Sequence, residues 1–369
     1  MRLETAVPAE ALAAIRAPFE GAGAVLTDAP VLQPLALLLD LAGEAMRSRL
    51  FVVQGEGGEE AALRPDLTIA IARAHIDSGA ACGRYAYEGK AFRVAPQGSG
   101  RAEEFLQVGI EVYGGADPLA DDAEVAALAW RAALAGGRDD LTMLLGDVSL
   151  FSAFVDSLRL EPALTARLKR AFSRPRLLKA ELEGEGPAAE ASRLAALLAG
   201  LPEAEAVGVL EELWTLAGIQ PVGGRTAAEI AHRLVERAQA TEGARLTTDE
   251  AGKIRAFLAV SDTPERALET IAGLSGGMSG PLQGWSRRLK AMTARGADAS
   301  RMRLSAAFGR AFGYYDGMLF EVRSDALGDE QPVAAGGRYD GLPARLGGAA
   351  TTAVGCMVRP ARAFVGGDQ

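Results

Sequence analysis

The chain has 369 residues, of which 49% are hydrophobic and 24% charged, as in globular proteins with room for two domains. Its 48 acidic and 39 basic side chains give a net charge of -9, which argues against a nucleic-acid partner because phosphate binding requires a basic surface. No apolar run reaches the ~20 residues that cross a membrane. The only histidines, His75 and His232, argue against a histidine-based metal site. Two distant cysteines, Cys82 and Cys356, and the lack of a signal peptide predict a reducing cytoplasm.

The first third of the chain mixes short apolar segments with prolines and glycines. We expect helices at Ala9 to Glu20 and Leu35 to Leu50, and short strands at Ala24 to Thr27 and Leu50 to Val53. The segment from Leu35 to Leu50 is apolar on most of its helical surface. Such a helix must be buried on more than one side, either in a core or against a partner.

A compact polar motif, Leu63-Arg64-Pro65-Asp66-Leu67-Thr68, precedes a predicted helix from Ile69 to His75. Pro65 fixes a turn, and Asp66 or Thr68 can cap the helix by accepting hydrogen bonds from its first backbone N–H groups. Capping alone would explain both polar side chains. The motif by itself therefore does not identify a ligand.

The most informative pattern lies between Arg84 and Gly114. A short run from Ala91 to Val94 is followed by a turn rich in proline and glycine, Pro96 to Gly100, and by a second run from Phe105 to Tyr113. Two strand-like runs around a glycine-rich loop predict a β-hairpin.

The second run of this hairpin places polar and aromatic residues on one side of a strand, because side chains alternate with period two. These residues are Phe105, Gln107, Gly109, Glu111 and Tyr113. A buried carboxylate costs several kcal/mol unless it is paired, so Glu111 requires a partner, and Arg93 on the first strand is the obvious one. A surface hairpin with a single salt bridge is the alternative interpretation.

From Asp147 to Ser300 the composition shifts to Ala, Leu, Glu and Arg, with Gly and Pro at the expected helix ends. Helical spacing occurs at Ala163 to Phe172, Ala188 to Leu198, Ala206 to Leu216 and Ala227 to Ala238. Trp214 and Trp285 lie on apolar helical faces and are interpreted as core residues. We expect this region to be a helical insertion without chemistry of its own.

Strand patterns return after Arg301. Strands are expected at Arg303 to Phe308, Met318 to Arg323 and Thr352 to Val358, and Ala334 to Leu342 is expected to be a glycine-rich turn that leads into a short helix. This turn fits neither a P-loop nor the dinucleotide-binding motif, and no GxSxG or HExxH pattern occurs. The residues alone therefore predict a mixed α/β protein with a polar pocket built from both ends of the chain, and they name no reaction.

Four segments together resemble the catalytic core of histidyl-tRNA synthetase, a class II aminoacyl-tRNA synthetase. They are RPDLT, the hairpin GKAFR…GR…EEFLQVGIE, GRAFGYYDGMLFE and AAGGRYDGL, in the order of that family. The resemblance implies an α+β fold with an antiparallel sheet flanked by helices. It assigns residues 1–146 and 301–369 to two parts of the core and 147–300 to a helical insertion. It also implies that the helix Leu35 to Leu50 forms a dimer.

Three departures from the synthetase pattern affect the expected function. The sequence runs to Gln369, so we expect no counterpart of the anticodon-binding domain, and Glu103 stands where the synthetase hairpin carries an arginine. The synthetase also carries an arginine three residues after the glycine of its last strand. Here Val358 stands three residues after Gly355, and Arg359 is displaced by one, which turns a strand side chain to the other face. We therefore expect the ATP half of the pocket to be damaged.

The amino-acid half of the pocket is retained. The residues that hold the substrate histidine in the synthetase correspond here to Asp66, Thr68, Arg93, Gln107, Glu111, Arg310, Tyr315 and Tyr339. Only Asp66 differs, because the synthetase has Glu at that position. Carboxylates suit the α-amino group and the imidazole N–H, an arginine suits the α-carboxylate, and aromatic rings suit the imidazole. The alternative is a polar network that holds the sheet together without a ligand.

A shortened synthetase core with a damaged ATP site resembles the family of regulatory subunits of ATP phosphoribosyltransferase. In that family the subunit assembles with a short catalytic subunit at the first step of histidine biosynthesis, and it is needed for activity and for feedback by histidine. The resemblance implies a subunit without catalytic residues, cofactor or metal, which dimerises, joins a hetero-oligomer and has free histidine as a candidate ligand.

Two alternatives stay open. A free-standing enzyme could activate an amino acid for an acceptor other than tRNA, but it would need an intact site for the ATP phosphates. A truncated histidyl-tRNA synthetase is disfavoured by the acidic charge balance and by the missing domain.

Overall fold

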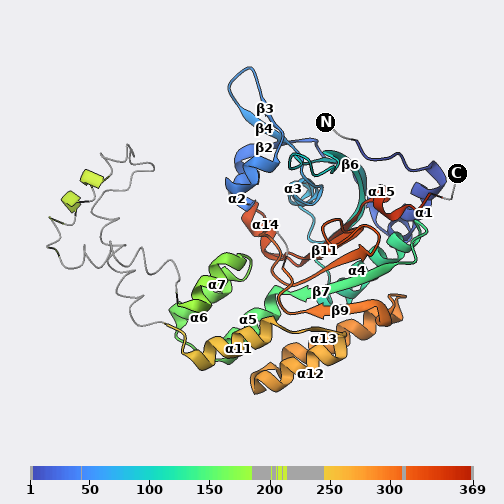
Figure 1. Ribbon diagram of the computed structural model, residues 1–369. Coiled ribbons are helices and arrows are strands. Elements are labelled where there is room, and N and C mark those ends of the chain that lie inside the picture. The colour runs from blue at the N-terminus through green and yellow to red at the C-terminus, as the bar shows by residue number, and fades with distance from the viewer. Residues whose placement is uncertain are drawn as a thin grey trace. The chain divides into compact units, whose positions relative to one another are not determined.

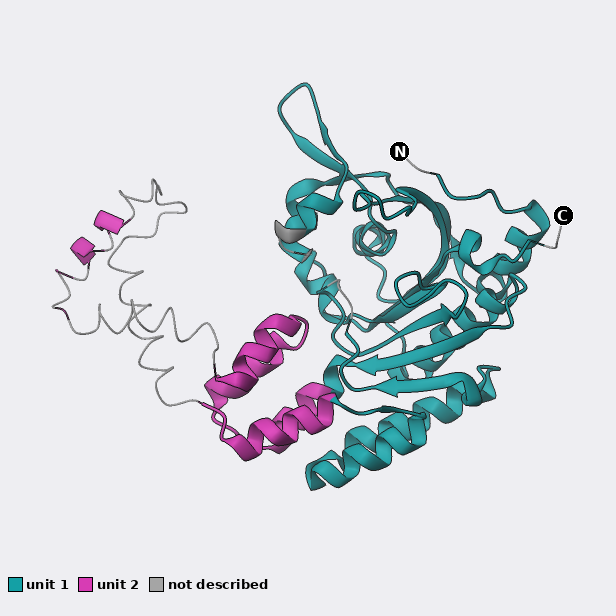
Figure 2. Ribbon diagram, in the orientation of Figure 1, with its two compact units in different colours: residues 1–150, 259–369 teal, residues 151–258 magenta. Residues whose placement is uncertain are grey.

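The computed structural model describes residues 3–42, 44–184, 201, 205, 207–209, 211–213, 245–309 and 313–366. The chain divides into two compact units, residues 1–150 with 259–369 and residues 151–258 (Figure 2). Among the described helices, none combines the length and the apolar character that crossing a bilayer demands. Each unit has its own core.

Unit 1 is built on a nine-stranded sheet (Figure 1). In spatial order its strands are β1 (Val25–Leu26), β5 (Gly83–Phe92), β6 (Glu104–Tyr113), β12 (Ala353–Val358), β11 (Ala334–Arg338), β10 (Met318–Ser324), β7 (Leu141–Asp147), β9 (Met302–Ser305) and β8 (Ser261–Asp262). The pairs β1–β5 and β7–β9 are parallel and the other neighbours are antiparallel. The expected α+β class is confirmed, with a mixed rather than purely antiparallel sheet.

The hairpin of β5 and β6 is longer than the sequence pattern indicates. Its pairing runs from Gly83 opposite Tyr113 to Phe92 opposite Glu104, so the predicted first strand, Ala91 to Val94, is only the end of β5. The loop between the strands spans residues 93–103. Strand β6 is an interior strand of the sheet, because β12 pairs with its other edge.

Strand β11 replaces the glycine-rich turn expected at Ala334 to Leu342. A Cβ on Gly336 would lie 2.4 Å from the carbonyl oxygen of Gly355, and one on Gly337 would lie 2.6 Å from that of Met318. The glycines therefore serve close packing between adjacent strands rather than a turn. The expected short helix does follow, as α14 (Gly341–Arg345).

Helix α4 (Pro118–Leu134) packs against β11 and β12 and also contacts α1 (Ala9–Glu20) and α13 (Ser279–Ala294). Its first turn is capped by Asp117, whose carboxylate accepts hydrogen bonds from the backbone N–H groups of Leu119 (3.1 Å) and Ala120 (3.2 Å). Most of its alanines are fully buried, because small side chains let the helix approach the sheet closely.

The predicted helix from Leu35 to Leu50 is present as α2 (Leu35–Ala42) and a 3-10 helix, η1 (Glu44–Arg49). Leu35, Leu38, Leu39 and Leu41 are buried in the same hydrophobic cluster as Ile71. Their burial is therefore achieved within the chain. A separate three-stranded sheet of β2 (Leu32–Pro34), β4 (Glu60–Leu63) and β3 (Val52–Gln54) flanks α2.

Unit 2, residues 151–258, comprises most of α5 (Val148–Ser157) together with α6 (Pro162–Ala171), α7 (Pro175–Glu183) and α11 (Thr248–Leu258). Its core stacks Phe151 on Phe172 and Phe154 on Phe257, with ring centroids 4.4 and 4.3 Å apart. The predicted helices Ala188 to Leu198 and Ala227 to Ala238, and Trp214, lie outside the described residues, and Ala206 to Leu216 is described only in part.

Residues 259–300 belong to unit 1, whereas the sequence pattern assigns 147–300 to one helical insertion. The reason is a set of buried contacts made by α13. Trp285 is buried, as expected, and its indole N–H donates to Asp147 at the end of β7 (2.8 Å). Arg288 forms a buried ion pair with Asp122 of α4 (2.8 Å). The remaining described elements are α3 (Thr68–Ser78), α12 (Pro264–Leu274), η2 (Gly276–Met278), η3 (Ala299–Arg301) and α15 (Pro360–Ala363).

Candidate functional site

A buried cluster of polar and aromatic side chains lies on the face of β6 that carries Phe105, Gln107, Glu111 and Tyr113. Phe105 and Tyr113 belong to one hydrophobic cluster with Leu67, which precedes α3, and with Tyr339, which follows β11. The cluster thus joins segments from both ends of the chain. Because the sequence predicts a site for an amino acid here, we call the cluster the amino-acid pocket, defined by Asp66, Thr68, Gln107, Glu111, Tyr315 and Tyr339.

Glu111 is the centre of this pocket and is completely buried. Its carboxylate accepts hydrogen bonds from the hydroxyl groups of Thr68 (2.7 Å) and Tyr339. The partner expected from the sequence was Arg93, but Arg93 follows the end of β5 and its Nε donates to the backbone carbonyl of Pro65 (2.8 Å). Among the described residues, neutral hydroxyl groups rather than a cation therefore contact this carboxyl group.

Burial raises the pKa of Glu111 to about 8, because removal from water disfavours the charged form. The hydrogen bonds from Tyr339 and Thr68 act in the opposite direction, and the nearby carboxyl of Asp66 adds to the rise. At neutral pH this group is therefore largely protonated, because the described residues bring no cation to it. A ligand that brings an ammonium or an imidazolium to it would stabilise the charged form.

The start of α3 supplies the next polar groups. Asp66 and Thr68 are both buried, and neither caps the helix, which has no side-chain cap at its N-terminus. Thr68 instead donates to Glu111 across the pocket. Helix capping therefore does not explain the polar residues of the RPDLT motif.

Gln107 is fully buried, and neither amide atom has a hydrogen-bond partner among the described residues. A buried amide without partners costs about 1–3 kcal/mol, so such groups are rare unless something else satisfies them. It lies on the same face of β6 as Glu111, four residues away. An amide that can both donate and accept is suited to a polar ligand in this pocket.

Aromatic rings form a wall around Tyr339, whose hydroxyl group contacts Glu111. The Tyr339 ring lies 6.2 Å from that of Tyr315 and 5.8 Å from that of Tyr314, measured between centroids. A Cβ on Gly355 would collide with Glu111 (1.5 Å), so β12 must expose bare backbone here. Arg310, the remaining predicted ligand of the α-carboxylate, lies outside the described residues.

Sequence reasoning missed a second aromatic layer behind the pocket. The His75 imidazole stacks on Tyr113 with centroids 4.4 Å apart, and its Nδ1 lies 2.9 Å from the Tyr85 hydroxyl. Burial lowers the pKa of His75, so its ring is neutral at neutral pH. The Tyr113 and Tyr339 hydroxyl oxygens are 3.4 Å apart, which links this layer to Glu111. The alternation of β6 already placed Tyr113 on the pocket face.

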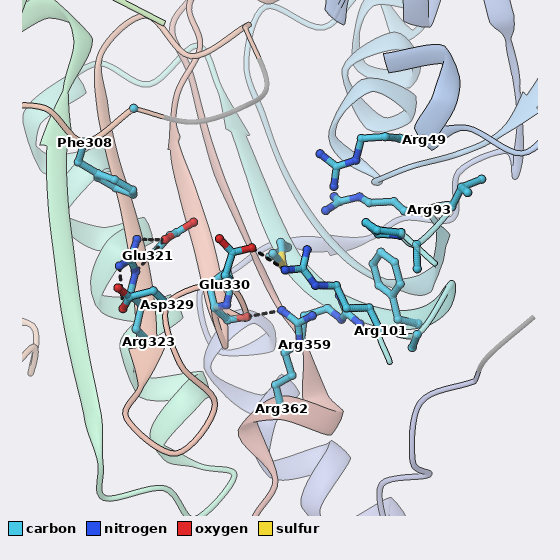
Figure 3. Close-up of a pocket in the computed structure, with 18 of the residues that line it drawn as sticks. Arg49, Arg93, Arg101, Phe308, Glu321, Arg323, Asp329, Glu330, Arg359 and Arg362 are labelled. Carbon is cyan, nitrogen blue, oxygen red and sulfur yellow. Dashed lines mark hydrogen bonds and ion pairs between the residues drawn. The ribbon is translucent and has the colours of Figure 1, made fainter. Parts of the chain in front are cut away.

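A basic cavity of about 450 Å³ adjoins Arg93 and Phe105 (Figure 3). Its charged lining residues are Arg49, Arg93, Arg101, Arg323, Arg359, Arg362, Glu321, Asp329 and Glu330. Figure 3 shows Arg49 and Arg93 on one side, with Arg101, Arg359 and Arg362 grouped near them.

This cavity corrects two expectations about the ATP half. Side chains two residues apart lie on the same face of a strand, so Met357 and Arg359 are expected on the face of Gly355. Both Met357 and Arg359 line the cavity. The displaced arginine is therefore on the pocket face after all. Glu103 does not line the cavity, since its carboxylate accepts a hydrogen bond from the backbone N–H of Ala95 (3.4 Å).

Comparison with known proteins agrees with this architecture. The family model of histidyl-tRNA synthetase matches residues 4–251 and 206–362. A structure titled ATP phosphoribosyltransferase regulatory subunit/histidyl-tRNA synthetase, from Bacillus halodurans, superposes with a TM-score of 0.65 at 20% identity, covering 98% of this chain and 79% of that one. A histidyl-tRNA synthetase from Nostoc gives a TM-score of 0.59 at 17% identity, covering 96% and 69%. At these identities the two structures establish the fold alone.

Curated relatives are closer in sequence. The ATP phosphoribosyltransferase regulatory subunit of Mesorhizobium japonicum is 36% identical in an alignment of 332 residues that covers 86% of each chain. The protein of the same name from Brucella anthropi is 34% identical in an alignment of 345 residues that covers 90% of each chain. On this similarity and on its histidyl-tRNA synthetase-like fold, the chain belongs to the family of ATP phosphoribosyltransferase regulatory subunits.

Proposed function

We propose that this chain is the non-catalytic regulatory subunit of an ATP phosphoribosyltransferase, which acts at the first step of histidine biosynthesis in the cytoplasm. It would activate a short-form catalytic subunit and transmit feedback by histidine. The identity shared with relatives of that name over most of both chains carries this proposal. The amino-acid pocket supports it, because a sensor needs a ligand site and no chemistry.

The proposed ligand of the amino-acid pocket is free histidine. The supporting features are the buried carboxyl of Glu111, the amide of Gln107 that has no partner among the described residues, and the aromatic wall at Tyr339. A carboxylate can accept from the α-amino group or the imidazole N–H, and an amide can satisfy either the donor or the acceptor nitrogen of the ring. Asp66, Thr68, Arg93, Arg310 and Tyr315 complete the proposed binding set.

A self-dimer is proposed through the small sheet beside α2. Cross-strand pairing places Leu32, Ala61 and Val53 on one face of it, opposite the face that carries the buried Ala62. Leu32 is 53% exposed and Val53 is 41% exposed. An apolar sheet face that is open to solvent is typical of an interaction surface, and a second copy of the chain can cover it symmetrically.

The alternative, a free-standing amino-acid-activating enzyme, is favoured by one observation, the arginine-lined cavity beside the amino-acid pocket. Such an enzyme would need ATP as well as the amino acid. Histidine-dependent exchange of pyrophosphate into ATP separates the two candidates, because only the enzyme supports it.

The experiment that tests the proposal is co-expression with a short-form phosphoribosyltransferase from the same genome. We expect a stable complex on size-exclusion chromatography, phosphoribosyl transfer at least tenfold faster than that of the catalytic subunit alone, and inhibition by histidine. Glu111→Gln should preserve the complex and its activity while weakening inhibition by at least tenfold. If the two chains neither associate nor alter each other's activity, the proposed function is wrong.

A further inference from the structure

The charges that line the basic cavity do not balance. Six arginines face three carboxylates, and Arg323 alone engages two of these, Glu321 (2.7 Å) and Asp329 (3.0 Å). Figure 3 shows this neutralised group on the side of the cavity opposite Arg49. The other five arginines share only Glu330 among the acidic lining residues.

Arg359 is the most constrained of these five. It is 4% exposed, and its Nε has no hydrogen-bond partner among the described residues, although its Nη2 reaches Glu4. Burial, and then repulsion from Arg362, lowers the pKa of Arg359 to about 9. A buried cation under these conditions is stabilised by an additional anion.

Two further contacts point to an exchangeable anion. Arg101 pairs with Glu330 at 2.5 Å, yet the Glu330 side chain is 81% exposed and can swing away into solvent. The Arg49 guanidinium makes no hydrogen bond or ion pair within the described part of the chain, and its residue is exposed. An anion could therefore replace Glu330 at Arg101, and it could bind Arg49 without displacing any described side chain.

Guanidinium groups lie over both phenylalanine rings that line the cavity. The Arg359 guanidinium lies 3.5 Å from the centroid of the Phe105 ring, with Arg93 at 5.4 Å from the same ring, and Arg323 lies over Phe308 at 5.6 Å. Guanidinium groups stack on rings in the position that a planar base would need. The Phe105 ring, which is 3% exposed, therefore offers no free face for a nucleobase, and Arg323 occupies one face of Phe308.

From these contacts we infer that the basic cavity binds a diphosphate group that carries no nucleobase, with Arg49, Arg101, Arg359 and Arg362 as its ligands and Glu330 as the internal anion that it displaces. Several guanidinium groups around one cavity match the spread of charge over two linked phosphates better than a single phosphate. The inference is independent of the proposed regulatory function, since it requires neither the catalytic subunit nor histidine.

The test is calorimetric titration of inorganic pyrophosphate into the full-length protein at low ionic strength, with orthophosphate and ATP as comparison ligands. We expect saturable binding of one pyrophosphate per chain, at least tenfold tighter than orthophosphate and tighter than ATP. Binding should weaken as salt is added, because the contacts are ionic. ATP that binds as tightly as pyrophosphate would place a nucleotide here and overturn the inference.

Matched variants localise the site. Arg49→Gln, at an exposed position that the fold does not need, should weaken pyrophosphate binding at least fivefold, whereas Arg287→Gln, an exposed arginine of α13, should not change it. Glu330→Gln should strengthen binding severalfold, because it frees Arg101, and Glu265→Gln on α12 should have no such effect. The site would be refuted if the wild-type protein showed no saturable binding of pyrophosphate. It would also be refuted if Arg49→Gln and Arg287→Gln bound pyrophosphate with equal affinity.

Discussion

At the scale of single residues, Glu111 is the group whose titration has the largest expected effect. Its pKa is about 8 in the folded chain and near 4.5 when unfolded, so between these pH values the folded chain binds more protons than the unfolded chain. The contribution of Glu111 to stability is therefore largest below pH 4.5 and is lost as pH rises toward 8, by a few kcal/mol.

The measurement for this prediction is urea unfolding from pH 5 to pH 8.5 for wild type and Glu111→Gln. The difference in free energy of unfolding between the two proteins should change across this range and level off above pH 8. Glu88→Gln is the matched control, because that partly exposed carboxylate pairs with Arg16 at 2.8 Å outside the pocket. Parallel pH curves for wild type and Glu111→Gln would contradict the prediction.

Gln107 distinguishes a ligand site from a structural polar network. Its amide has no protein partner in the described residues, so Gln107→Met should leave the stability unchanged or raise it by about 1 kcal/mol, while histidine binding weakens at least tenfold. Gln33 is an equally buried control that does have partners, Pro30 (2.8 Å) and Arg73 (3.3 Å). Gln33→Met should be destabilising. Equal losses of stability in both variants would mean that Gln107 serves the fold.

Much of this pocket followed from residue patterns. Period-two alternation placed Gln107 and Glu111 together on one buried face, and the family resemblance added Thr68 and Tyr339, which the structure brings to Glu111. The partner of Glu111 could not be deduced, because pairing depends on where β5 ends relative to Arg93. The alternation of β12 also predicts the position of Arg359, but comparison with the synthetase spacing pointed to the opposite face.

At the scale of elements, α2 shows that an apolar helix does not by itself indicate a dimer interface. Leu38 is 2% exposed in the chain's own core, so Leu38→Glu would unfold the protein rather than only separate two copies. The proposed dimer surface is better tested on the outer face of the small sheet, where apolar side chains are exposed in a single chain.

Leu32→Glu and Val53→Glu should convert the proposed dimer to a monomer in sedimentation velocity, with little change in thermal unfolding of the monomer, because both positions are solvent-exposed before association. Val25→Glu, on the edge strand β1 and 67% exposed, is the control and should remain dimeric. A monomeric wild type, or a dimer that both small-sheet variants preserve, would exclude this interface.

Elements with regular alternation or helical spacing were predictable, whereas β11, with two consecutive glycines, was not. The helix Ala9 to Glu20 has the predicted bounds, and β10 and β12 lie within a residue of theirs. Strand β11 was missed because two glycines signal a turn in isolation, whereas here they allow neighbouring backbones to approach. Similarly, the limit of the helical insertion depends on the contacts of Trp285 and Arg288 with distant aspartates.

At the scale of the whole molecule, the proposed role requires binding without catalysis. The purified protein should show no histidine-dependent exchange of pyrophosphate into ATP above background, because Arg359 covers Phe105 and leaves no ring face for adenine. A full-length histidyl-tRNA synthetase under the same conditions is the positive control. Exchange that Arg93→Ala abolishes would establish the enzyme alternative instead.

The identity of the catalytic partner could not be predicted from physical patterns in the chain. Charge and composition argued against nucleic acid, but no surface feature specified a phosphoribosyltransferase, and this expectation came from resemblance alone. For histidine to regulate such a complex, it must bind the active and inhibited assemblies with different affinities. Histidine affinity should therefore differ between the free subunit and the complex, which calorimetry on both can measure.

Because the carboxyl group of Glu111 is protonated in the free protein, ligand binding is also expected to release a proton. When a positively charged ligand group comes to rest beside it, the pKa of about 8 falls, and near neutral pH a proton must leave for the solvent. The heat of histidine binding at pH 7 should then differ between phosphate and Tris buffers, which absorb protons with different enthalpies. In Glu111→Gln the heat difference between the two buffers should be smaller, because up to one proton fewer is released per site. The buffer dependence of the binding heat therefore reports whether the buried carboxyl group contacts the ligand.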